Sequence, residues 1–208
     1  MSDQLGDSLT ETLAESELSD LSSEIAEVAL DSFLQDGFLK DLPVINIITG
    51  LWKTGVTVRD FLLTKKLIYF LNEIQDIPAE RRKRMLANLE RDKEFRGKVG
   101  DNLMLLIDRL DSLGKARFLG KAFRAYVNES FDSSHFWDLA LIIDRLPSHY
   151  IQKIRDWQSL AIPSLSSIEH QLYLSVGVGI FDIRVSGSVF GWNEEICELL
   201  CNYILNND

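Results

Sequence analysis

The spacing of the apolar residues constrains the fold of this chain more than any other feature. Along most of the sequence they recur three and four positions apart, which places them on one face of a helix. The clearest sets are Leu103, Leu106, Ile107 and Leu110; Leu119, Ala122, Phe123 and Tyr126; and Phe136, Leu139, Ala140 and Ile143. The pattern predicts a mainly α protein built as a multi-helix bundle.

The character of the sequence changes once, near the C-terminus. Residues 179–185 are rich in β-branched and aromatic side chains, 186–188 are typical of a turn, and 189–192 can return as a second strand. Asn193 would then cap a final helix, and a further helix lies between Pro147 and Pro163. This order of helices and a small C-terminal β-hairpin predicts a winged-helix-like end.

Charge is divided unevenly along the chain. Residues 1–36 contain ten acidic residues and no basic one, which accounts for the whole net charge of −10. Residues 79–124 hold 13 bases and 7 acids, whereas residues 125–208 hold 4 bases and 11 acids. An acidic N-terminal segment, a basic middle and an acidic end therefore organise the electrostatics.

Three regions follow from these patterns. Ser8 and Glu11 have the spacing of a capping box, and the apolar positions that follow predict an amphipathic helix ending near Gly37. We expect an acidic helical leader over 1–36, a helical core over 37–146 and a winged-helix-like region over 147–208.

The first residues lack a signal peptide, so the expected location is the cytoplasm. Cys197 and Cys201, four residues apart, are expected to be reduced thiols.

The stretch DLPVINIITGLWKTGVTVRDFLL, residues 41–63, is apolar around almost the whole circumference of any helix it forms. It is too short and too interrupted by bases to span a bilayer. Burial in the core is the expected resting state, and an apolar hairpin over 42–71 that meets an anionic membrane on activation is the alternative. The residues that decide between them are Ile47, Ile48, Leu51, Trp52, Lys65 and Lys66.

A basic run within 79–98 is the best candidate for binding a partner or an anion. Its members are Arg81, Arg82, Lys83, Arg84, Arg91, Arg96 and Lys98. Such patches neutralise phosphates, but the acidic character of the C-terminal hairpin region and of the whole chain disfavours nucleic acid. The acidic face of the leader is an internal partner for this run, and the apolar stripe of the leader would supply most of the docking energy.

Three segments resemble a group of uncharacterised bacterial proteins. These are PVINIITGLWKTGVTVRDFLLTKKLIYFL, the spacing of residues from Asp92 to Asp111, and KARFLGKAFRAYV. Their arrangement also resembles the abortive-infection alpha family, in which a helical core precedes a winged-helix-like end. The resemblance covers residues 40–205. It implies a bacterial protein with a role in phage defence, and it transfers no active-site residue.

Sequence motifs for catalysis are missing. The three histidines lie on different predicted helices without a second ligand at metal spacing, and neither a phosphate-binding loop nor a nucleophile motif occurs. We therefore expect no catalytic, cofactor or metal site. The expected function is a non-enzymatic interaction or regulatory protein with a protein partner or self-association, in which the leader masks an apolar or basic surface. The alternatives are a membrane-perturbing effector acting at the inner membrane through 42–71, and a nucleic-acid binder using the helix at 79–98.

Overall fold

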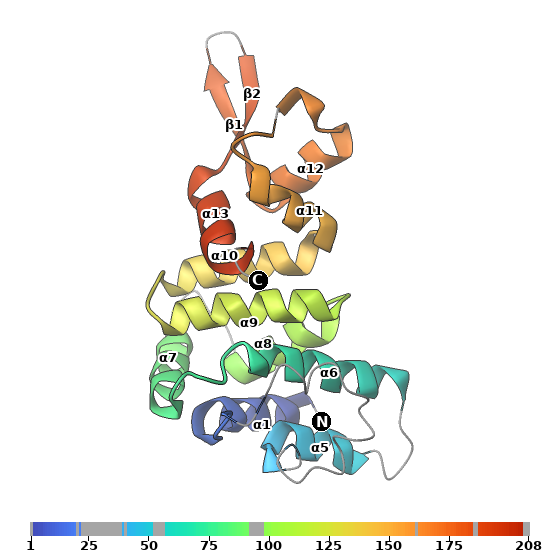
Figure 1. The fold of residues 1–208 in the computed structure, drawn as a ribbon, viewed down its shortest axis with the longest axis vertical. Helices are drawn as coiled ribbons and strands as arrows, with labels where there is room; N and C mark the ends of the chain where they lie inside the picture. The colour runs from blue at the N-terminus through green and yellow to red at the C-terminus, as the bar shows by residue number, and fades with distance from the viewer. Residues whose placement is uncertain are drawn as a thin grey trace. The chain divides into compact units, whose positions relative to one another are not determined.

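The computed structural model describes residues 2–19, 21, 39, 41–51, 57–91, 98–160, 162–184 and 187–205. The chain divides into two compact units, Met1–Ser133 and Ser134–Asp208. Both are mainly helical, and the second carries a small antiparallel hairpin, so the predicted fold class is confirmed. Figure 1 shows the elements along the chain.

The first unit is a helical bundle. Its helices are α1 (Ser2–Glu15), α5 (Pro43–Leu51), α6 (Val58–Asn72), α7 (Ala79–Arg91), α8 (Val99–Arg109) and α9 (Leu113–Val127). Helix α9 packs on α6, while α1 lies against α5, α7 and α8 (Figure 1). The predicted apolar positions of α8 and α9 are all buried, as their spacing requires.

Local sequence explains where α6 and α9 begin. The Thr57 hydroxyl accepts a hydrogen bond from the Asp60 amide at 3.2 Å, and the Asp60 carboxylate accepts one from the Thr57 amide at 3.1 Å. This reciprocal pair satisfies two amide groups that have no partner within the helix. Ser112 starts α9 in a similar way by accepting a hydrogen bond from the amide of Lys115 at 3.3 Å.

The second unit contains the predicted hairpin between helices. Its elements are α10 (Ser133–Arg145), α11 (Ser148–Lys153), the 3-10 turns Ile154–Asp156 and Ile162–Ser164, α12 (Ser167–Ser175), β1 (Gly179–Arg184), β2 (Gly187–Trp192), α13 (Glu194–Leu199) and the π-helical turn Leu200–Leu205. Asn193 caps α13 as predicted, because its side chain accepts a hydrogen bond from the Ile196 amide.

The N-terminal region differs from the expected leader. Helix α1 begins at Ser2 and ends at Glu15, so Ser8 lies inside the helix, where its hydroxyl donates to the Leu5 carbonyl. The predicted helix start at Ser8 was therefore wrong. The expected stop at Gly37 lies outside the described residues. The apolar face of α1 is buried, and this helix belongs to the first compact unit, which ends at Ser133.

Candidate interaction site

Helix α1 is enclosed by three other helices of its unit. The side chains of Leu9 and Leu13 are fully buried, and Thr12 between them is buried as well. The Thr12 hydroxyl donates to the Ser8 carbonyl at 2.8 Å and accepts a hydrogen bond from the Val44 amide, at the start of α5, at 3.1 Å. A polar residue on the buried face of α1 thus ties this helix to α5.

The backbones of α1 and α8 approach each other closely because each helix has a glycine at the contact. A Cβ atom on Gly100 would lie 2.8 Å from the carbonyl carbon of Gly6 and closer still to its oxygen. A Cβ atom on Gly6 would lie 2.7 Å from the backbone nitrogen of Asp101. Since real Cβ atoms do not approach backbone atoms this closely, any other residue at these positions would push the two helices apart.

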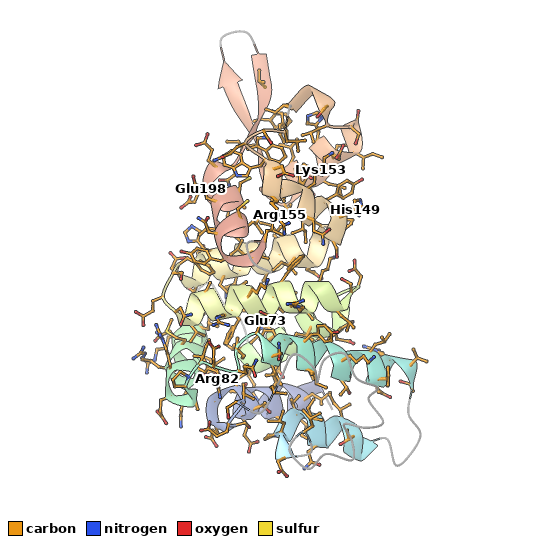
Figure 2. All side chains as sticks on the ribbon, viewed as in Figure 1. Glu73, Arg82, His149, Lys153, Arg155 and Glu198 are labelled. Atoms are coloured by element: carbon orange, nitrogen blue, oxygen red, sulfur yellow. The ribbon has the colours of Figure 1, made fainter. Side chains whose placement is uncertain are left out.

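Arg82 holds the C-terminal end of α1 through hydrogen bonds to backbone carbonyls. Its side chain is 1% exposed, and its guanidinium donates to the backbone carbonyls of Leu13, Ser16 and Ile77, with the bond to Leu13 measuring 2.7 Å (Figure 2). Burial lowers the pKa of Arg82 from its usual value, while Glu17 opposes that shift. A cation placed at the carbonyl end of a helix also interacts favourably with the helix dipole.

The prediction that Arg82 belongs to an exposed basic patch was therefore wrong. Helical spacing explains its burial, since Arg82 lies on the same face of α7 as Met85, Leu86 and Leu89, which are buried too. That spacing is the sequence signal that could have identified it. The four consecutive bases form a charge pattern, and that pattern alone does not show that Arg82 lies on the apolar face of the helix.

Exposed bases near Arg82 pair with acidic residues of α1. The ammonium of Lys83 lies 3.8 Å from the carboxylate of Glu15, and that of Lys98 lies 2.9 Å from the carboxylate of Asp7. The structure thus places the acidic helix α1 against part of the predicted basic run. The pairs are more than half exposed, so each contributes only about 0–1 kcal/mol.

The other predicted basic residues are not gathered around a common site. Arg81 donates to the Val127 carbonyl at 3.0 Å, and Arg84 pairs with Glu129 at 3.2 Å. Arg91 is exposed at the end of α7, and Arg96 lies outside the described residues. Arg81 and Arg84 thus both reach the C-terminal end of α9, whereas Lys83 and Lys98 pair with α1.

The apolar stretch contributes to the core through α5. Ile48 is buried together with Val44 and Ile45, whereas Ile47 is partly exposed. Helix α5 packs against α1, so the same helix that covers α7 also covers this stretch. Of the other predicted residues, Trp52 and the side chain of Leu51 lie outside the described part of the chain.

Both lysines predicted to flank a membrane hairpin make contacts within the first unit. The Lys65 ammonium lies 4.9 Å from the centre of the Phe61 ring. Lys66 donates to the Asp108 carbonyl at 2.8 Å, and partial burial lowers its pKa. Within the described residues, no helix is both long enough and apolar enough to cross a bilayer.

A surface pocket opens beside the C-terminal end of α1. It has a volume of about 710 Å³ and is lined by residues that include Glu15, Glu17, Gln75, Pro78 and Lys83. These residues come from the end of α1, from the α6–α7 turn and from α7. The pocket leaves the end of α1 accessible from solvent, close to the residues that Arg82 holds.

Two of the histidines make contacts within the second unit. The Nε2 atom of His135 lies 3.2 Å from a carboxylate oxygen of Glu195, and the ring of His149 packs on its neighbour Tyr150. Among the described residues, no cluster of histidine, cysteine and carboxylate side chains is arranged to hold a metal ion.

Neither cysteine has a reactive environment. Cys197 and Cys201 are free thiols, and burial raises the pKa of Cys197 to about 12. Burial also raises the pKa of Cys201, so neither thiol is held as a nucleophilic thiolate.

Comparison with known proteins adds no family or fold assignment. No family model, no curated protein and no solved structure matches this chain.

Proposed function

We propose that this chain is a non-enzymatic interaction protein in which α1 covers a binding surface formed by α5, α7 and α8. A similar amphipathic helix, from a protein partner or from a second copy, takes the place of α1 on this surface. The observation that carries the proposal is the enclosure of α1, which combines a buried apolar face, the hydrogen bonds of Arg82 and exposed ion pairs.

The energies favour replacement of α1 over simple opening. Four leucines of the N-terminal segment, Leu9, Leu13, Leu18 and Leu21, are at most 1% exposed. Burying a leucine contributes about 1.5–3 kcal/mol, whereas an exposed ion pair contributes about 0–1 kcal/mol. An uncovered surface would lose most of this energy. A partner helix with leucines at the same spacing and acids on its outer face would restore it.

The two alternative functions have less structural support. Nucleic-acid binding through 79–98 would need exposed, clustered cations, but Arg82 is buried and Lys83, Arg84 and Lys98 already face carboxylates. Membrane binding through 42–71 would need an accessible apolar face, yet the buried part of α5 lies against α1. A role in phage defence stays a prediction from the family resemblance, and a cytoplasmic location stays a prediction from the composition of the first residues.

The test uses a labelled peptide containing residues 2–21 as the incoming helix. In the intact chain, the tethered α1 competes with it at an effective concentration on the order of millimolar. The substitution Leu13→Ala in the full-length chain weakens the tethered helix by about 2–5 kcal/mol without changing α5, α7 or α8. We expect the native peptide to bind this variant at least roughly ten-fold more tightly than it binds the unmodified chain.

Two controls make the experiment specific. A peptide that carries Leu13→Ala should bind the variant chain poorly, and the native peptide should not gain affinity for a chain with Leu62→Ala, because Leu62 is exposed on α6. If the Leu13→Ala chain loses helical content, the native peptide should restore it. The proposal is overturned if the native peptide neither binds nor restores this variant, or if both peptides bind it equally.

A further inference from the structure

The β1–β2 hairpin is fixed at its base by aromatic packing against α12. The rings of Tyr173 and Trp192 lie 5.1 Å apart, and those of His170 and Phe190 lie 4.7 Å apart. Phe190 also packs edge-on against Trp192 at 5.4 Å. The side-chain amide of Asn193 donates to the Gly177 carbonyl at 3.0 Å, which closes the base.

Next to this base, the hairpin exposes apolar side chains on both faces. Phe181 is 61% exposed and stands opposite Phe190 in the antiparallel register. Ile180 and Val189, which are 44% and 43% exposed, lie on the other face, since neighbouring strand residues point to opposite sides. Figure 1 shows the hairpin extending away from α11, α12 and α13. These three side chains contribute exposed apolar surface that the packed base does not need.

Each strand also has one backbone edge that does not pair with the other strand. The Asn193 amide donates to the Val178 carbonyl at 2.9 Å, so these two residues form a hydrogen-bonded pair. From this pair onward, non-hydrogen-bonded and hydrogen-bonded residue pairs alternate along the hairpin. The backbone groups of residues 179 and 181 on β1, and of 190 and 192 on β2, therefore point outward. Within the described residues the sheet has only these two strands. An edge of this kind can pair with an added strand.

Charge determines which kind of strand fits. Residues 134–208 contain nine acids and four bases. Two of the bases make contacts within the unit, because Lys153 pairs with Glu169 and Arg155 donates to the Leu205 carbonyl at 2.8 Å. Glu194 and Glu198 are exposed on α13, directly after β2, and Figure 2 shows Glu198 at the outer side of that helix. The surroundings of the hairpin therefore favour a basic ligand.

We propose that the β1–β2 hairpin docks an extended segment of a protein partner, which pairs with a free edge as a third strand. The segment has apolar side chains at alternate positions, which meet Phe181 or Ile180, and basic side chains between them. A second copy of the chain, a nucleic acid and an anionic bilayer all carry negative charge and are disfavoured. This inference goes beyond the proposed function, because it lies in the other unit and does not involve α1.

The experiment is a selection of short random peptides, displayed on phage, against the full-length chain. We expect the enriched peptides to be basic with apolar residues at alternate positions. In solution, Phe181→Ser should weaken the binding of an enriched peptide roughly ten-fold. Ile168→Ser is the matched control, because Ile168 is 63% exposed in the same unit but lies on α12, away from the hairpin.

Further measurements distinguish strand addition from non-specific binding to the exposed apolar side chains. Methylating alternate backbone amides of the enriched peptide should abolish binding, and replacing both Glu194 and Glu198 by glutamine should weaken binding and reduce its dependence on salt. If Phe181→Ser disturbs the near-ultraviolet circular dichroism of the aromatic cluster, Ile180→Ser replaces it as the test variant.

Several outcomes would overturn the inference. These are the absence of any enriched peptide, the enrichment of acidic peptides, equal binding to the Phe181→Ser and unmodified chains, or a self-associated state in sedimentation that depends on Phe181. Failure of the α1 peptide to bind the Leu13→Ala chain would leave this inference intact, since the two experiments use different ligands and different variants.

Discussion

Arg82 shows how one residue can join two helices that lie far apart in the sequence. Its three carbonyl partners come from α1, from the residue after α1 and from the turn before α7, and the bonds to Leu13 and Ile77 are buried. Replacing it by methionine keeps much of the side-chain volume but leaves these carbonyls without their donor. We expect Arg82→Met to lower the free energy of unfolding of the first unit by about 2–4 kcal/mol, measured by urea denaturation.

Arg84→Met is the matched control for this prediction. Arg84 lies two residues away on the same helix, but it is largely exposed and pairs with Glu129 at 3.2 Å. Its loss should change the free energy of unfolding by less than about 0.5 kcal/mol. Equal effects of the two substitutions would show that the hydrogen bonds of Arg82 do not hold α1.

Residue-scale contacts are also where prediction from the sequence was weakest. Thr57 and Asp60 form the capping box that starts α6, and their spacing can be read from the sequence. The partners of Arg82 are different, because two of them are backbone carbonyls more than sixty positions away. Spacing can place Arg82 on a buried face, but only the folded chain shows which carbonyls it reaches.

At the scale of elements, the pair of glycines determines how closely α1 and α8 pack. The substitution Gly100→Ala adds a methyl group where the backbone of Gly6 already lies. Overpacking costs about 1–3 kcal/mol, which outweighs the gain of up to about 1 kcal/mol that alanine brings to a helix. We therefore expect a lower free energy of unfolding, measured by urea denaturation, and faster hydrogen exchange in α1.

Gly114→Ala provides the opposite expectation in a neighbouring helix. Gly114 lies in the first turn of α9, and a Cβ atom there would meet no atom within 4 Å. This substitution should stabilise the unit by up to about 1 kcal/mol. If both alanines stabilise the protein, the close contact between α1 and α8 is not required by the fold.

Helix positions could be predicted from the sequence where the apolar period is regular, as in α8 and α9, and the hairpin could be predicted from its β-branched residues and turn. The start of α1 could not be. The capping-box pattern at Ser8 and Glu11 lies within the helix, and Gly6, which would normally weaken a helix, is tolerated because it packs on Gly100. Tertiary contact outweighs local preference at this position.

At the scale of the whole molecule, apolar burial and not charge accounts for most of the contact between α1 and its unit. The acidic residues of 1–36 carry the net charge of −10, but Asp7 and Glu15 make only exposed ion pairs. The leucines on the other face of the same segment are almost completely buried. The acids keep the outer face of α1 in water, while the leucines hold it in place.

This balance predicts a weak response to salt. At roughly 1 M sodium chloride the screening length falls to about 3 Å, which removes most of the attraction between exposed charges and leaves apolar burial intact. Hydrogen exchange of the α1 amides should therefore stay slow in the unmodified chain as salt rises. It should be fast in the Leu13→Ala chain at every salt concentration. Release of α1 by salt alone would instead identify the ion pairs of Lys83 and Lys98 as the main contacts holding it.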